Sequence, residues 1–87
     1  MPRVFIPPQL RSLTNDLTEV DITGTNVRQV IDALDAKHPG IRSRLCEGDE
    51  LKPGLTVAIG RRMGTLGLLE KVDENSEVHF LPAIGGG

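Results

Sequence analysis

Hydrophobic and polar residues alternate near the beginning of the chain. Residues 3–6 are mostly β-branched or aromatic, and the prolines at positions 7 and 8 cannot donate hydrogen bonds to a sheet. Further on, Val20 and Ile22 alternate with polar neighbours, which is the period of a half-buried strand. The pattern predicts a first strand over residues 3–6 and a second strand over residues 19–23, antiparallel to the first.

A helical period follows directly. The hydrophobic positions at spacings of three and four residues, which place them on one stripe of a helix, are Val27, Val30, Ile31 and Leu34. Asn26 is a good N-cap, and Gln29 is placed to reach back to the amide of the cap residue. A proline and a glycine at positions 39 and 40 supply the stop. The pattern predicts a helix from about Asn26 to Lys37 or His38.

The second half of the chain contains shorter segments. Residues 41–45 are typical of an amphipathic turn, residues 47–50 of a polar, acidic loop, and residues 53–54 of a tight turn. Residues 55–59 predict a strand with Val57 and Ile59 directed inward.

The segment between Gly60 and Leu69 lacks a clear period. We expect irregular or 3₁₀ structure there, with Leu66, Leu68 and Leu69 directed into the core. After a turn at residues 73–76, residues 77–81 alternate again and predict the last strand, which turns Val78 and Phe80 inward.

The order strand, strand, helix, strand and final strand requires the helix to bury its stripe against a sheet. This order predicts an α+β fold of the β-grasp, ubiquitin-like type, with a mixed sheet packed on one main helix. We expect a β-grasp domain over residues 1–82 and a flexible glycine tail over residues 83–87.

Composition excludes several classes of function. The 10 basic and 12 acidic side chains do not form the excess of positive charge that nucleic acid requires. No hydrophobic run approaches the roughly 18 residues needed to span a membrane, and no secretory signal is recognised. One cysteine and two histidines do not make a metal site. We expect a soluble, cytoplasmic protein without nucleic-acid or membrane partners.

The C-terminal segment carries the resemblance to a known family. It reads Leu81-Pro82-Ala83-Ile84-Gly85-Gly86-Gly87, and in this order it resembles the end of the MoaD/ThiS sulfur carriers, which include the small subunit of molybdopterin synthase. The similarity extends to the helix start at residues 26–27, to residues 39–41 and to the acidic turn before Val78. A departure is Ile59-Gly60-Arg61, where many members of the family have an asparagine-glycine turn.

The resemblance implies a function for the terminal carboxylate. Gly87 would be adenylated by a ubiquitin-activating-like adenylyltransferase, and a sulfur donor protein would convert it to a thiocarboxylate for an acceptor biosynthetic enzyme. The carrier itself would be no enzyme and would bind no cofactor, because ATP is used by the activating partner. An α-carboxyl group with a pKa of about 3.3 to 3.7 is ionised at neutral pH and can act as a nucleophile. Gly86 lacks a Cβ and so permits close approach inside a partner's active site.

Strand alternation also predicts a docking surface. With Val78 and Phe80 inward, His79 and Leu81 face outward beside the tail. We expect Phe5 and Ala58 on neighbouring strands to join them as a partner-docking patch, as similar surfaces do in ubiquitin-like proteins. The tail residues Pro82, Ile84 and Gly85 would contact the partner as well.

Other candidate functional residues are better explained by structural roles than by a role in catalysis or binding. Cys46 has no flanking lysine or histidine, and Glu47 is expected to raise its pKa. His38 is placed to cap the helix end. Residues 60–64 lack the lysine and serine or threonine of a phosphate-binding loop, so both arginines are expected to be solvated. The turn carboxylates, also expected to be solvated, are Glu47, Asp49, Glu50, Asp73 and Glu74.

Three functions remain open at this point. The leading hypothesis is a sulfur carrier that serves molybdopterin, cysteine or thiamine biosynthesis, with the tail context closer to the first two. The alternative is a ubiquitin-like protein modifier conjugated to lysines through Gly87. The third is a non-reactive interaction domain, whose function would survive deletion of Gly86 and Gly87.

Overall fold

The first and last strands of the chain lie side by side at the centre of a sheet. The computed structural model describes residues 1–82. In it, β1 (Arg3–Phe5) pairs in parallel with β7 (Glu77–Pro82), so that Val4 lies opposite Val78. β1 also pairs antiparallel with β2 (Glu19–Asp21), which confirms the predicted pairing of the first two strands.

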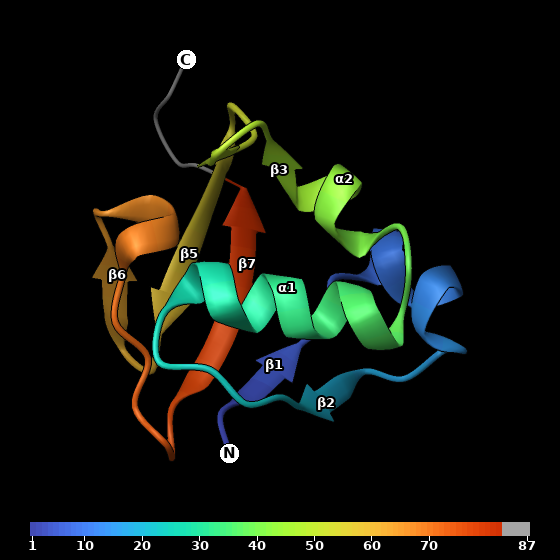
Figure 1. Ribbon diagram of the computed structural model, residues 1–87, viewed down its shortest axis with the longest axis horizontal. Coiled ribbons are helices and arrows are strands. Elements are labelled where there is room, and N and C mark those ends of the chain that lie inside the picture. Colours follow the sequence, from blue (N-terminus) through green and yellow to red (C-terminus); the bar gives the residue numbers. More distant parts are fainter. Residues whose placement is uncertain (83–87) are drawn as a thin grey trace.

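On its other side β7 pairs antiparallel with β5 (Leu55–Ile59), and β5 pairs with β6 (Arg62–Gly64). Within residues 1–82 the main sheet therefore has five strands, in the order β2-β1-β7-β5-β6 (Figure 1). The short strands β3 (Cys46–Glu47) and β4 (Glu50–Leu51) form a separate hairpin.

The predicted helix is α1 (Val27–Lys37), and its capping explains where it begins. The Oδ1 atom of Asn26 accepts a hydrogen bond from the backbone N–H of Gln29 at 2.8 Å, as an N-cap should. The Gln29 side chain reaches back as expected, but to the backbone N–H of Thr25 at 2.8 Å and not to that of Asn26. Because Thr25 and Asn26 also pair with the segment near Lys71, the start of the helix is held on two sides.

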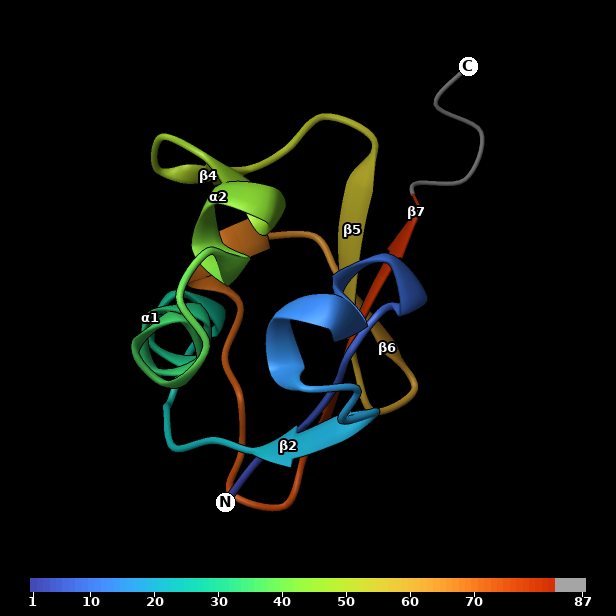
Figure 2. The same cartoon turned by 90° about the vertical axis from the view of Figure 1, so that its right-hand side faces the viewer.

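The hydrophobic stripe of α1 packs on one face of the sheet. Figure 2 shows α1 end-on beside the sheet. Buried hydrophobic side chains fill the layer between them. The fully buried residues of this layer come from the helix, from the strands and from the segment just after β2, and include Val4, Ile22, Val27, Val30, Ile31, Leu34, Val57 and Val78. The hydrophobic core therefore lies between the helix and the sheet, and the opposite face of the sheet is not part of it.

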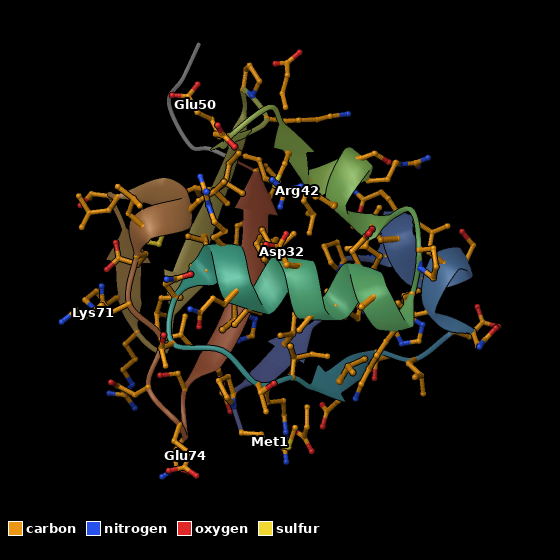
Figure 3. All side chains as sticks on the ribbon, viewed as in Figure 1. Met1, Asp32, Arg42, Glu50, Lys71 and Glu74 are labelled. Carbon is orange, nitrogen blue, oxygen red and sulfur yellow. The ribbon has the colours of Figure 1, made fainter. Side chains whose placement is uncertain are left out.

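Short helical elements close the ends of this layer. η1 (Pro8–Thr14) follows β1, and α2 (Ile41–Leu45) packs against both α1 and η1. A single carboxylate oxygen of Asp35 accepts hydrogen bonds from the backbone N–H groups of Gly40 and Arg42, and so fixes the start of α2. The side chain of Arg42 pairs with Asp32 of α1 (Figure 3).

Residues 60–69 differ from the expectation. Residues 62–64 form β6, where irregular structure was predicted, and η2 (Gly67–Leu69) is the expected 3₁₀ turn. Only Leu68 of the three leucines is buried, whereas Leu66 and Leu69 are 61% and 70% exposed. A 3₁₀ turn this short can direct only one side chain into the core, so the prediction for Leu66 and Leu69 is wrong.

Arg62 is exposed, as expected of a solvated arginine, but its side chain is also tied to the protein. Its guanidinium pairs with the carboxylate of Glu70, which is buried, and donates to the carbonyl oxygen of Lys71 at 3.3 Å. The other carboxylate oxygen of Glu70 accepts from the backbone N–H of Leu66 at 3.2 Å. This arrangement ties β6 to the segment that follows it, which explains why a strand forms without β-branched residues.

Candidate functional site

The outer face of the sheet carries one row of side chains across four strands. His79 of β7 lies opposite Phe5 of β1 on one side and opposite Ala58 of β5 on the other. Ala58 in turn lies opposite Met63 of β6. Since Val78 and Phe80 are buried on the inner face, alternation places His79 and its row on the outer face, as predicted.

An aromatic pair forms the centre of this row. The rings of Phe5 and His79 stack with centroids 4.2 Å apart and planes inclined by 8°. The Nε2 atom of His79 also lies 3.6 Å from the Oε1 atom of Glu77, an ion pair whenever the imidazole is protonated. Both rings are half-buried, so they present a flat surface that is already ordered before any partner arrives.

Ala58 corrects part of the predicted docking patch. It lies in the outer row, but it is only 7% exposed and offers almost no contact area. The reason is its size, because the neighbours across the sheet are the longer side chains of His79 and Met63. Met63 is 48% exposed at the end of the row, and it was missed because β6 was not recognised as a strand. Pairing residues 57–59 with residues 62–64 in the sequence would have found it.

The row continues toward the C-terminal end of β7. Leu81 lies opposite Thr56 and is 39% exposed, and the exposed Pro82 lies opposite Leu55. The predicted tail residues Ile84, Gly85, Gly86 and Gly87 lie outside the described residues. We use the name docking face for Phe5, Met63, His79 and Leu81, with Ala58 as its floor.

Cys46 lies in an environment that disfavours a reactive thiolate. The thiol is buried, and burial raises its pKa, which is only partly opposed by the positive charge of Arg42. The predicted direction is confirmed, but the cause is burial and not the neighbouring Glu47.

The other turn carboxylates are exposed, as expected. His38 lies at the C-cap of α1, where its backbone N–H donates to the carbonyl oxygen of Leu34.

Residues 1–82 contain neither a cluster of metal ligands nor a membrane-spanning helix. No group of three or more histidine, cysteine, aspartate or glutamate side chains in this range is placed to hold a metal ion. No helix in the same range has the length and hydrophobicity to cross a membrane. The described part of the chain is a folded domain, and its last strand, β7, ends where the C-terminal segment begins.

In this domain a helix packs on one face of a mixed sheet, and the central strand β7 is the last element before the C-terminal segment. This strand order and packing define a β-grasp domain of the ubiquitin-like class. The sequence model of the ThiS family matches residues 4–87, nearly the whole chain. The chain belongs to the ThiS family. A search of the curated proteins finds no match.

Solved structures agree with this assignment. The chain is similar to one in the crystal structure of the Amycolatopsis orientalis BexX/CysO complex, at 29% identity and a TM-score of 0.90 over 100% of both chains. Mycobacterium tuberculosis CysO, described as an antigen, is 26% identical with a TM-score of 0.87, over 97% of this chain and 100% of that one. SAMP1 from Haloferax volcanii is 26% identical with a TM-score of 0.69, over 99% and 98% of the two chains. The fold is therefore that of small ubiquitin-like carriers.

Proposed function

We propose that the chain is a sulfur carrier whose reactive group is the terminal carboxylate of Gly87. One observation carries the proposal: the ThiS family match extends from residue 4 to the last glycine and so includes the tail as well as the domain. The similarity to CysO over the whole chain supports it. Under this proposal the domain is not an enzyme, and its side chains serve to dock partners that carry out the chemistry.

Sulfur is loaded onto the terminal carboxyl group in two displacements. A carboxylate oxygen of Gly87 attacks the α-phosphorus of ATP on a ubiquitin-activating-like adenylyltransferase, and pyrophosphate leaves. A sulfide equivalent from a donor protein then attacks the carbonyl carbon, and AMP leaves with the original oxygen. The product is a thiocarboxylate, whose sulfur attacks an electrophilic carbon held by an acceptor enzyme in the cytoplasm. Water then attacks the carbonyl carbon of the resulting thioester, the sulfur leaves on the acceptor's substrate, and the tail returns as the carboxylate. The carrier holds no cofactor, and ATP is bound by the activating partner.

The role proposed for the docking face follows from the cost of ordering the tail. Fixing each backbone residue in an extended path costs about 1 to 2 kcal/mol, and glycine costs more than other residues. A hydrophobic patch that is already ordered, such as the Phe5–His79 stack with Leu81 beside it, offsets this cost when the partner binds. The acceptor is an enzyme of molybdopterin, cysteine or thiamine type. The existence of a BexX/CysO complex supports a stable contact between such a carrier and a second protein.

Intact mass spectrometry tests the proposal. The full chain is incubated with the adenylyltransferase of the same organism, ATP and the sulfur donor, and we expect one oxygen of the C-terminus to be replaced by sulfur. A variant lacking Gly86 and Gly87 is the control and should gain no sulfur. If the full chain never forms an acyl adenylate with this enzyme, the proposal is wrong.

Similarity to SAMP1 favours a second candidate, a protein modifier that shares the adenylation step. In that case Gly87 would form an isopeptide bond with lysines of other proteins. Cell extracts digested with trypsin would then contain lysines bearing residues 72–87 as a branch, because no lysine or arginine follows Lys71, and these branched peptides would disappear when the terminal glycines are deleted. Sulfur incorporation without such conjugates favours the carrier.

A further inference from the structure

A groove lies beside the root of the tail, around the edge of the docking face. It is an open groove with a volume of about 800 Å³, lined by the ends of β1 and β7, the start of β5, η1 and α2. In Figure 2 the start of β5 and the segment that follows β1 lie near the C-terminal end of β7, and α2 lies further from it. Its walls are largely hydrophobic, and they include Pro7, Leu10, Leu45, Leu55 and Phe80.

Among the described residues, the polar side chains of the groove are two arginines, a glutamine and a histidine, so its lining has basic residues but no acidic ones. Arg11 and Arg44 line it, and no aspartate or glutamate among residues 1–82 does. This is unexpected for a chain in which 12 acidic residues outnumber 10 basic ones. Neither arginine forms an ion pair with a carboxylate of the described residues, whereas Arg3, Arg28, Arg42 and Arg62 each do.

Arg11 is held in position by the backbone. Its Nε atom donates to the carbonyl oxygen of Ile6 at 3.1 Å, which fixes the guanidinium at the groove wall and leaves its terminal N–H groups for another acceptor. Arg44 is exposed on α2. A guanidinium on each of two elements, above hydrophobic walls, is an arrangement that favours carboxylates carried on a hydrophobic segment.

A second hollow of the molecule provides a comparison. It has a volume of about 710 Å³ and lies between the β3–β4 hairpin, β5 and η2. Its charged rim mixes signs, with Glu47, Asp49 and Glu50 beside Arg28 and Lys52, and Arg28 pairs with Asp49 at 3.6 Å. Charge at this hollow is largely neutralised within the protein, whereas the charge of the groove is not.

We propose that the groove binds an acidic segment of the adenylyltransferase, with carboxylates on Arg11 and Arg44 and a hydrophobic side chain between them. This inference rests on the proposed function and names the second contact made by the same partner. Leu81 and Pro82 line the groove, so an enzyme that takes up the tail must pass directly over it. Charge complementarity of this kind raises the association rate and selects the correct partner.

The test is ATP–pyrophosphate exchange by the purified adenylyltransferase of the same organism, with the full chain as the varied substrate. For Arg44→Glu we expect the KM for the chain to rise about tenfold at low salt while kcat stays unchanged, because only docking is affected. The difference should shrink as salt is raised. Arg11→Gln should raise KM in the same direction but by less.

Arg61→Glu is the matched control, since it makes the same charge change on an exposed arginine. Arg61 follows β5, at the end of the molecule opposite to the end of β7 (Figure 1). Its KM should change by less than about twofold, because the screened field falls off over such a distance. Melting temperatures of Arg44→Glu and Arg61→Glu should match that of the unchanged chain, which shows that folding is intact.

The outcomes separate the two proposals. If Arg44→Glu and Arg61→Glu give equal KM values, or if the effect falls on kcat alone, the groove does not dock the enzyme and the inference is overturned while the proposed function stands. If the unchanged chain supports no exchange at all, the proposed function is wrong and the inference fails with it.

Discussion

The two faces of the central sheet are built from alternate residues of the same strands, yet they do different work. On β7, Val78 and Phe80 are buried against α1, while His79 and Leu81 face the other way and remain partly exposed. The inner face is covered by helix and loops. The outer face carries side chains that remain partly exposed, among them Met63 at 48% and Leu81 at 39%.

The difference teaches how a small domain can combine stability with recognition. A domain of this size has a single core, so most of the hydrophobic burial that stabilises it lies on the inner face. The outer face carries the stacked rings of Phe5 and His79 and the exposed Met63 and Leu81, whose hydrophobic surface contributes less to folding. Changes on the two faces should therefore have separable effects, and the predictions below test this separation.

The largest expected difference is between the two phenylalanines, the only ones in the chain. Phe80→Ala removes a side chain that is 6% exposed, and we expect the free energy of unfolding to fall by about 3 to 5 kcal/mol. Phe5→Ala removes a half-buried ring stacked on His79, and the loss should be about 1 kcal/mol.

Urea unfolding followed by circular dichroism measures both values. The two variants serve as controls for one another, because the deleted atoms are the same. Equal losses would contradict the division of labour between the faces. Partner docking should show the reverse order, with the Phe5→Ala domain still folded but binding its adenylyltransferase more weakly.

Much of the fold could be predicted because its patterns are local. The helical stripe from Val27 to Leu34 and the alternation around Val78 depend only on residue type and spacing, and both are confirmed. β6 could not be found in this way. Arg62, Met63 and Gly64 have little preference for a strand, and they form one because β5 offers an edge and Glu70 a buried partner.

The candidate site was predicted in outline but not in detail. Alternation correctly placed His79 and Leu81 on the outer face, with Phe5 beside His79. The exposure of Ala58 depends on the length of the side chains opposite it in the sheet, and the sequence alone does not say which strands are neighbours. The groove is harder still, because Arg11 and Arg44 come from distant segments that only the packing of η1 on α2 brings together.

A second prediction concerns the edge of the inner face, where Glu70 pairs with Arg62. The hydrogen bond from Arg62 holds the pKa of Glu70 below its ordinary value of about 4.3. A carboxyl with a lowered pKa in the folded state stabilises the fold above its pKa in the unfolded chain, and this contribution is lost as the pH falls through the folded pKa. Glu70→Gln should therefore be less stable than the unchanged chain at pH 7, with the gap closing below pH of about 4.

Unfolding measured across this pH range checks the prediction. The control is Glu74→Gln, a change of the same kind in an exposed turn at the end of the molecule opposite to Glu50 (Figure 3). The difference in the free energy of unfolding between Glu74→Gln and the unchanged chain should be small and constant across this pH range. A gap for Glu70→Gln that stays constant down to acid pH would mean that packing, and not the charge of Glu70, holds β6 in place.

The smallest expected effect on stability belongs to Leu81. Since it is 39% exposed on the outer face, Leu81→Glu should change the free energy of unfolding by less than about 0.5 kcal/mol. Binding to the adenylyltransferase should nevertheless weaken by more than about tenfold, because a carboxylate would have to be desolvated at the centre of the contact. Leu69→Glu makes the same change on a leucine that is 70% exposed on η2, away from the docking face, and should alter neither quantity. Calorimetric titration measures the binding, and thermal unfolding measures the stability. If Leu81→Glu unfolds the domain, Leu81 stabilises the fold as a core residue does, and the outer face is not a separate binding surface.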